Sequence, residues 1–248
     1  MDSLVQRYLR SSITQGRETE RIGPFLASFS RSSRNPFLNY AIPDDDAQAS
    51  DSDAGGLIDA YERRDLKPRL EYLSSCAPNV EETLLRAGFA VEGRLALMLA
   101  DDRAFDVAAP ADIELLRPAT DDELRGVRIV QVEAYADPEP VDDAAVDRLR
   151  RNLREGAGAV LARAIGNGEP AGAGEYTQPI DGVTEIVGIA VRESFRRRGI
   201  AAAMTRWLLP EARAAGVTVP FLMANEAEER IYTRVGFTTT SQVLHISR

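Results

Sequence analysis

The sequence contains very few residues that can form disulfides or bind transition metals. Among its 248 residues there is one cysteine, Cys76, and one histidine, His245. One cysteine allows no intrachain disulfide, which is typical of proteins in a reducing cytoplasm. One cysteine and one histidine are also too few for a four-ligand zinc site. We therefore expect a cytoplasmic protein without a metal, in which Cys76 is a small residue of a semi-buried loop.

Long apolar runs and an excess of positive charge are also missing. No segment reaches the roughly 20 consecutive apolar residues that cross a bilayer, and residues 1–7 do not resemble an export signal. The formal net charge is −9, whereas binding to nucleic acid requires a dense basic surface. We therefore expect neither a membrane nor a nucleic-acid partner. An acidic surface instead favours a cationic partner such as an amine.

A dinucleotide-binding fingerprint is absent as well. Gly166, Gly168, Gly172 and Gly174 miss the spacing Gly-x-Gly-x-x-Gly. They lie between two strand candidates, so they are interpreted as a hairpin loop.

The most informative segment, residues 184–201, combines a strand, an arginine-rich turn and a helix. Its β-branched residues predict a strand over Glu185–Val191, and Gly188 within it predicts a bulge where a neighbouring strand diverges. Helical spacing follows over residues 199–215, with a kink or a change of helical turn expected at Pro210.

This turn is suited to bind a diphosphate. Amides at a helix N-terminus lack intrahelical acceptors, and the positive end of the helix dipole faces the same way. Gly199 and Ala201 are small enough to let a diphosphate approach, and three consecutive arginines, Arg196 to Arg198, add charged donors. The segment therefore predicts a site for a cofactor that carries a pyrophosphate.

Two motifs in one order now point to a family. Arg196-x-x-Gly199-x-Ala201 after a strand resembles the acyl-CoA signature Arg/Gln-x-x-Gly-x-Gly/Ala of the Gcn5-related N-acetyltransferases (GNAT). Residues 221–237 resemble that family's strand, asparagine and helix ending in Tyr-x-x-x-Gly-Phe. The resemblance implies an α/β protein with a mixed sheet in the acyl-CoA N-acyltransferase fold. It also implies acetyl-CoA as co-substrate and a primary amine, on a small molecule or a peptide, as acceptor.

The resemblance assigns roles to the matching residues. A backbone N–H near Ile189 would polarise the acyl carbonyl, Tyr232 would protonate the departing thiolate, and Asn225 would bind the pantetheine arm. Glu185 is the candidate base, with Glu175 on the preceding strand or an ordered water as alternatives. The cofactor-binding set is Ile189, Ala190, Val191, Arg196, Arg197, Arg198, Gly199, Ile200, Ala201, Ala202 and Asn225.

The first half of the chain resembles a second, degenerate copy. Residues 79–98 and 227–246 align at an offset of 148, with Gly-Phe after a helix candidate in each. In the first copy Leu84 replaces the tyrosine, and carboxylates between Asp44 and Asp53 replace the phosphate turn and would repel a pyrophosphate. We expect a polar segment over 1–20, an incomplete GNAT-like half over 21–105, a linker over 106–111 and a catalytic domain over 112–248.

Three functions remain open at this point. The leading hypothesis is direct acetyl transfer from acetyl-CoA to a primary amine in a ternary complex. The second is a catalytically inactive acyl-CoA sensor or regulator. The third is an interaction protein that captures a basic partner with its acidic first half. The amine could belong to a peptide N-terminus, a lysine, a polyamine, an aminoglycoside or another small molecule, and a homodimer is compatible with the sequence.

Overall fold

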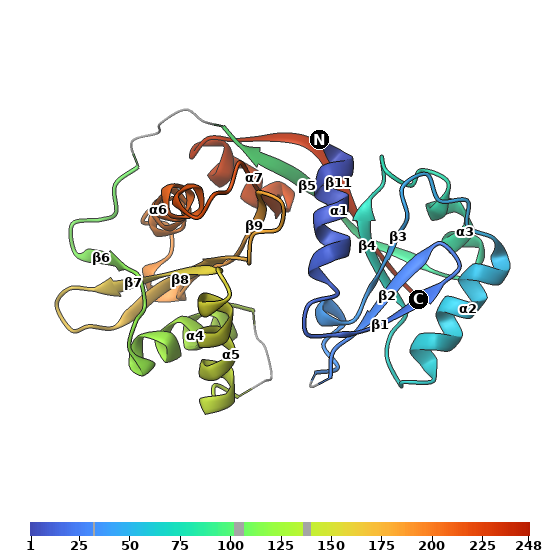
Figure 1. Ribbon diagram of the computed structural model, residues 1–248. Coiled ribbons are helices and arrows are strands. Elements are labelled where there is room, and N and C mark those ends of the chain that lie inside the picture. The colour runs from blue at the N-terminus through green and yellow to red at the C-terminus, as the bar shows by residue number, and fades with distance from the viewer. Residues whose placement is uncertain (32, 102–106, 136–139) are drawn as a thin grey trace. The chain divides into compact units, whose positions relative to one another are not determined.

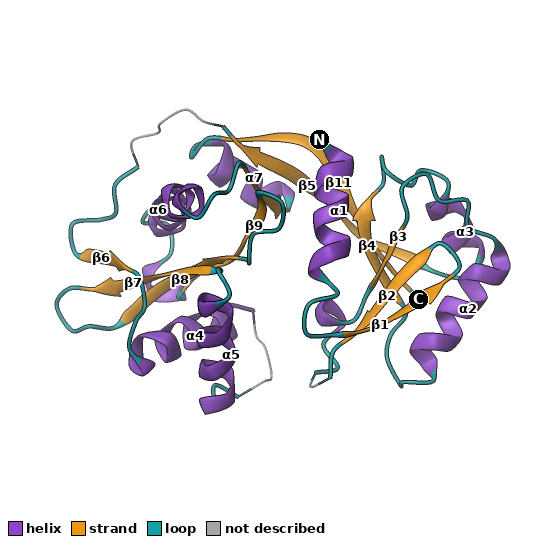
Figure 2. Ribbon diagram, viewed as in Figure 1, coloured by secondary structure: helices purple, strands orange, loops and turns teal. Residues whose placement is uncertain are grey.

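The computed structural model describes residues 1–31, 33–101, 107–135 and 140–248. Helices and strands are mixed throughout these residues (Figures 1 and 2). They form two compact units. The first comprises Met1–Leu97, Met223–Glu226 and Thr239–Arg248, and the second Met98–Leu222 and Ala227–Thr238. The first residue of the expected linker, Asp106, lies outside the described residues. No described helix has the length and apolar character needed to span a bilayer.

The second unit is a sheet with helices packed on it. Its strands lie in the order β10-β9-β8-β7-β6, with bounds β6 Ile113–Leu116, β7 Gly158–Ala164, β8 Pro170–Tyr176, β9 Val183–Val191 and β10 Val219–Ala224. The last two residues of β10, Met223 and Ala224, belong to the first unit. Helices α4 (Asp121–Tyr135) and α5 (Asp143–Arg154) lie on one side of β7 and β8, and α6 (Ile200–Ala214) lies on the other (Figure 1). Helix α7 (Glu226–Thr233) follows β10. The bounds of β9 and α6 agree closely with the strand predicted over Glu185–Val191 and the helix predicted over residues 199–215.

The alternation of glycine and larger residues in β8 determines which helix packs on which face. Ala173 packs with α4 and α5 residues in an apolar cluster, since successive strand residues face opposite sides. Gly172 and Gly174 therefore face α6. A Cβ on Gly172 would lie 3.0 Å from Met204 Cε, and one on Gly174 would lie 2.5 Å from Ile189 Cδ1. The expectation that these two glycines belong to a loop is wrong, because both lie in β8, where the missing Cβ makes room for Met204 of α6 and for the side chain of Ile189 on the neighbouring β9.

Strand β9 has the expected bulge at Gly188. Its register against β8 shifts between Ala173 and Glu175, so that two residues of β9, Gly188 and Ile189, oppose the single residue Gly174. Gly188 has φ +63°, a conformation that glycine adopts without a Cβ penalty. Parallel pairing of β9 with β10 covers Val183–Glu185 and Val219–Phe221. This pairing between β9 and β10 therefore ends before the bulge, whereas β9 itself continues to Val191.

The first unit has the strand order β1-β2-β3-β4-β11-β5. Its strands are β1 Glu18–Ile22, β2 Phe25–Phe29, β3 Ala41–Pro43 and β4 Arg69–Leu73, together with residues 90–97 of β5 (Ala90–Ala100) and residues 239–247 of β11 (Phe237–Ser247). Its helices are α1 Asp2–Ser12, α2 Asp51–Glu62 and α3 Val80–Arg86. The C-terminal residues Val243–Ser247 pair antiparallel with β4. The first unit therefore receives a central strand from the far end of the chain.

Residues 1–20, expected as a polar segment, contain α1, which buries Val5, Tyr8 and Leu9 in the first unit, and the start of β1 at Glu18. The change of helical turn considered for Pro210 does not occur, because α6 continues as an α-helix through this exposed proline.

The internal repeat is visible in the structure. Helix α3 ends before Gly88 and leads into β5, and α7 ends before Gly236 and leads into β11. Gly88 has φ +87° and Gly236 has φ +95°, so both helix ends use the left-handed backbone that glycine favours. The matching sequence segments therefore adopt the same order of elements.

Candidate active site

The turn before α6 presents a group of unpaired backbone donors. Within the described part of the chain, the six N–H groups of residues 197–202 have no hydrogen-bond acceptor, and the first helical bond joins Ala203 N to Gly199 O at 3.0 Å. Arg197 has φ +60° and Gly199 has φ +82°, so the chain turns sharply before the helix begins. A Cβ on Gly199 would contact nothing within 4 Å, which leaves the space beside these amides open.

The three arginines of the turn differ in their contacts. Arg198 Nη2 lies 2.5 Å from Asp112 Oδ1, and the Arg198 guanidinium lowers the pKa of the Asp112 carboxyl. Arg196 Nε donates to Val191 O at 3.2 Å. Arg197 has no polar partner among the described residues and is exposed. The side chain of Arg197 is therefore available to an anion, whereas that of Arg198 is held by an aspartate.

The bulged end of β9 brings together the three residues expected beside the thioester. Ile189, Ala190 and Val191 follow Gly188 directly, and Ala190 is buried. Ile189 O accepts a hydrogen bond of 3.3 Å from the Tyr135 hydroxyl at the end of α4. This end of β9 leads through a short 3₁₀ turn, Glu193–Phe195, into the six unpaired amides.

The two candidate bases lie on the same face of the sheet. Glu175 pairs with Val187 in the register, and Glu185 is two residues before Val187, so all three side chains face α4 by strand alternation. Burial raises the pKa of Glu175, and a hydrogen bond from Gln131 with the positive charge of Arg128 partly opposes the increase. Glu175 is 13% exposed. Glu185 is half-buried, and its backbone pairs with Thr177.

Tyr232 and Asn225 lie on different parts of the segment that follows β10. Tyr232 is 8% exposed, and its ring meets Phe237 edge-on with centroids 6.1 Å apart. Burial, together with Glu228 and Tyr135, raises the pKa of Tyr232, so the hydroxyl stays protonated at neutral pH. Asn225 is exposed directly after β10, in the segment that belongs to the first unit. Their roles toward a cofactor stay predictions.

The sequence patterns do not predict a polar network that Gln131 of α4 forms with the sheet. Gln131 is 6% exposed, donates from Nε2 to Glu175 Oε1 at 2.8 Å and to Gly188 O at 3.2 Å, and accepts from Arg128 Nη1 at 2.8 Å. One feature of the sequence could have indicated this network. Gln131 is four residues after the buried Val127, so it is a polar residue at a position where helical spacing favours an apolar side chain.

The first unit has different contacts at the corresponding places. The amide of Gln6 on α1 donates to Pro43 O of β3 at 3.3 Å and accepts from Leu73 N of β4 at 3.0 Å. Its side chain is fully buried and joins the two strands, which pair at Ala41 and Leu70. At α2, Ser50 caps the amide of Asp53. The first unit thus has a bridging glutamine and a capped helix where the second unit has a bulge and uncapped amides.

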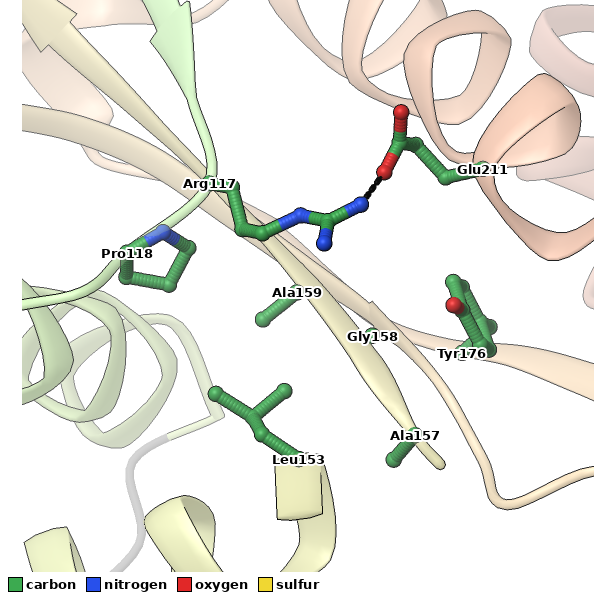
Figure 3. Close-up of a pocket in the computed structure, with 8 residues that line it drawn as sticks. All are labelled: Arg117, Pro118, Leu153, Ala157, Gly158, Ala159, Tyr176 and Glu211. Carbon is green, nitrogen blue, oxygen red and sulfur yellow. Dashed lines mark ion pairs between the residues drawn. The ribbon is translucent and has the colours of Figure 1, made fainter. Parts of the chain in front are cut away.

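A separate cavity of about 170 Å³ lies in the second unit, with an ion pair between Arg117 and Glu211 at its edge (Figure 3). Its lining residues are Arg117, Pro118, Leu153, Ala157, Gly158, Ala159, Tyr176 and Glu211. Glu211 is twelve residues after Gly199, which corresponds to about 18 Å along the helix. No residue of the predicted cofactor set lines this cavity.

Comparison with known proteins agrees with this geometry. Residues 126–237 match the family model of the acetyltransferase (GNAT) family. A GCN5-related N-acetyltransferase from Kribbella flavida has 20% identity and a TM-score of 0.81, with 100% of this chain and 95% of that chain covered. One from Sphaerobacter thermophilus has 15% identity and a TM-score of 0.69, with 91% and 76% covered. No curated protein sequence matches the chain.

A third solved structure bears on the repeat. A tandem GNAT protein from the clavulanic acid biosynthesis pathway, determined without acetyl-CoA, has 11% identity and a TM-score of 0.62, with 90% of this chain and 78% of that chain covered. At these identities the likeness concerns the fold. Together with the matched domain, it confirms the mixed α/β fold with two GNAT-like halves. Residues 126–237 therefore form a GNAT acetyltransferase-family domain, and the chain has the mixed α/β fold seen in a tandem GNAT protein.

Proposed function

We propose that the second half of the chain, about residues 112–248, transfers an acetyl group from acetyl-CoA to a primary amine in a ternary complex. The observation that carries this proposal is the run of six unpaired amides directly after a bulged strand. Backbone donors at a helix N-terminus bind a diphosphate without any particular side chain. The amides of residues 197–202 would hold the pyrophosphate of CoA, with Arg196 and Arg197 near the nucleotide phosphates.

The reaction requires three groups around the thioester. The amine nitrogen attacks the carbonyl carbon, a C–N bond forms, and the C–S bond breaks as the thiolate leaves. The N–H of Ile189 would stabilise the negative charge that develops on the carbonyl oxygen, as preorganised backbone donors do. Asn225 would bind the pantetheine arm and keep the thioester beside the bulge.

The base must take a proton from the amine. An alkylammonium with a pKa of about 10.4 is almost entirely protonated at neutral pH, which costs roughly 4–5 kcal/mol for the reactive form. Glu185 remains the base inferred from the resemblance, with Glu175 or an ordered water as alternatives. Burial raises the pKa of Glu175, which makes its carboxylate a stronger base than a solvent-exposed one. Tyr232, protonated in its buried position, would donate its proton to the leaving thiolate and recover one from the nitrogen, which loses its second proton as the amide forms.

The test is a thiol-release assay with purified protein, acetyl-CoA and a panel of amines that represents peptides, polyamines, aminoglycosides and small amines. The proposal expects free thiol to appear in stoichiometric amount with one acetylated amine. Calorimetric titration with acetyl-CoA is measured in parallel. Binding without thiol release for any amine would contradict catalysis and favour the acyl-CoA sensor. Absence of binding would contradict the cofactor site itself.

A further inference from the structure

The peptide group between Gly188 and Ile189 is held by a side chain of α4. Gln131 Nε2 donates to the carbonyl oxygen of Gly188 at 3.2 Å and to Glu175 Oε1 at 2.8 Å. Its Oε1 accepts from Arg128 Nη1 at 2.8 Å. Both donors and the acceptor of this buried amide are therefore used, as a buried polar group requires.

Arg128 determines which way the amide of Gln131 points. A guanidinium has only donors, so the oxygen of the amide must face Arg128. The NH₂ group then faces the carboxylate of Glu175 and the carbonyl of Gly188, both of which are acceptors. A flipped amide would place donor against donor and acceptor against acceptor. Arg128 and Glu175 thus orient Gln131 toward the bulge.

The contact with Gly188 has a direct consequence for Ile189. Gly188 C=O and Ile189 N–H belong to one planar trans peptide group, in which oxygen and hydrogen point in opposite directions. When the oxygen is held toward α4, the N–H is directed away from α4. A hydrogen bond to the oxygen also polarises the group and strengthens the N–H as a donor. Gly188 is required here, because a Cβ would lie 2.4 Å from Gln131 Nε2.

We propose that Gln131 is a positioning residue for acyl transfer: by binding Gly188 O, it directs and strengthens the Ile189 N–H that polarises the acyl carbonyl. This inference rests on the proposed function of the same site. Tyr135, one helical turn after Gln131, adds a weaker and more exposed contact to Ile189 O at 3.3 Å. Helix α4 therefore holds both residues of the bulge from the same side.

The test compares Gln131→Met with the parent protein and with Gln6→Met. Methionine keeps the length of the side chain but removes every hydrogen bond. Gln6 is a matched control, because it is equally buried, binds two backbone groups and lies in the first unit. Gln131→Met is expected to lower kcat about 10- to 100-fold. This decrease is similar to, or smaller than, the decrease caused by removing an oxyanion donor directly. The Kd for acetyl-CoA should stay within about threefold, since the amides of residues 197–202 are unchanged.

A second readout does not depend on turnover. In an amide-resolved NMR titration with acetyl-CoA, the Ile189 N–H of the parent should shift strongly downfield, and Gln131→Met should abolish most of that shift. If the parent shows the shift but no thiol release, the proposed catalysis fails while the positioning role of Gln131 stands. If the Ile189 N–H resonance of the parent protein does not shift when acetyl-CoA is added, the inference is overturned.

Equal losses of kcat in Gln131→Met and Gln6→Met would also overturn the inference, because general destabilisation would then explain both. So would a Gln131→Met protein with kcat within about twofold of the parent. If Gln131→Met does not fold, Arg128→Gln provides the test, since Arg128 is partly exposed and its loss frees the amide to rotate. A decrease of about three- to tenfold in kcat with unchanged Kd is then expected, and an unchanged kcat contradicts the inference.

Discussion

Single side chains in this protein owe their protonation states to burial and to specific donors. Tyr232 and Glu175 are buried, and burial raises the pKa of each. Glu92 of the first unit shows the opposite balance. Burial raises its pKa, but donors from Ser247, Lys67 and Arg69 outweigh that effect and lower the pKa to about 2. These opposite shifts lead to separate predictions on activity and on stability.

Replacing Tyr232 with phenylalanine should lower turnover by about 10- to 1000-fold, with little change in acetyl-CoA binding, because in the proposed reaction the hydroxyl protonates the leaving thiolate. Steady-state kinetics and calorimetry measure the two effects. Tyr176→Phe is the matched control, since this buried tyrosine lines the separate cavity and should retain turnover. Normal turnover in Tyr232→Phe would remove Tyr232 from its proposed role.

Glu92 should stabilise the first unit at neutral pH. Its folded pKa of about 2 lies below the ordinary value near 4.3. The contribution is therefore complete above about pH 5 and is lost as the pH falls toward 2. Because solvent partly screens this half-exposed carboxylate, Glu92→Gln should lower the free energy of unfolding by about 1–2 kcal/mol at pH 7. The loss should be much smaller near pH 2.5 in urea titrations followed by circular dichroism.

The exposed Glu82 provides a control for Glu92. It is 83% exposed and pairs with Arg86 one turn away on α3. Such helix pairs contribute about 0.3–0.5 kcal/mol. A loss in Glu92→Gln no larger than that in Glu82→Gln, or a loss independent of pH, would show that the donors around Glu92 do not stabilise its charge.

At the scale of elements, the first turn of α6 differs from that of α2. Residues 197–202 have no acceptor for their amides among the described residues, whereas Ser50 and Asp53 form a reciprocal capping box at α2. Asp51 and Asp53 also place negative charge at α2, which stabilises the helix but repels phosphate. The corresponding position therefore favours an anion in one half and disfavours it in the other.

Gly199→Glu should abolish acetyl-CoA binding, because a carboxylate would occupy the space beside the α6 amides and repel the diphosphate. Calorimetric titration measures the effect. Gly216→Glu is a close control, since Gly216 follows the other end of α6, has φ +88°, and a Cβ placed on it would also contact nothing within 4 Å. It adds the same charge and similar backbone strain, and it should leave binding unchanged.

Gly199→Ala separates strain from obstruction. Its φ of +82° costs roughly 1 kcal/mol for a residue with a Cβ, yet the methyl group meets nothing within 4 Å. Binding should therefore survive with a modest loss of stability. Normal affinity in Gly199→Glu, or equal loss in Gly216→Glu, would contradict the phosphate-turn assignment.

Local sequence patterns predict most elements but not their polar connections. The strand–turn–helix over residues 184–201 can be predicted because β-branched residues, a glycine and then helical spacing follow one another in the sequence. Glycine alternation in β8 resembles the composition of a loop, since periodicity cannot reveal that α6 packs against it. Local patterns miss Gln6 and Gln131 for a related reason. The importance of both side chains comes from carbonyls on distant strands, and no local pattern encodes those partners.

At the scale of the whole chain, the repeat has kept its fold while its two halves differ in what they leave open. The first unit is completed by Val243–Ser247 from the C-terminal strand. Its β3 and β4 are joined by Gln6, and its Asp44 pairs with Arg10 at 2.7 Å. The unit has a buried core of its own, with Phe25, Leu57 and Leu70 fully enclosed. The first half can therefore serve as a structural unit without binding a second cofactor molecule.

The chain should therefore bind one molecule of acetyl-CoA. Calorimetry at a protein concentration well above Kd gives the stoichiometry directly, and a value near one per chain is expected. Gly199→Glu should reduce that value to zero rather than reveal a weaker second site. A stoichiometry of two would show that the carboxylates and Gln6 do not close the first half.

The proposed function depends on diphosphate binding by the backbone amides of residues 197–202. Amide-resolved hydrogen exchange, measured with and without saturating acetyl-CoA, reports on these amides one by one. We expect exchange at residues 197–202 to slow strongly when acetyl-CoA is added, and exchange at residues 51–54 in the first turn of α2 to stay the same. If exchange at residues 197–202 does not slow under saturation, these amides do not hold the diphosphate.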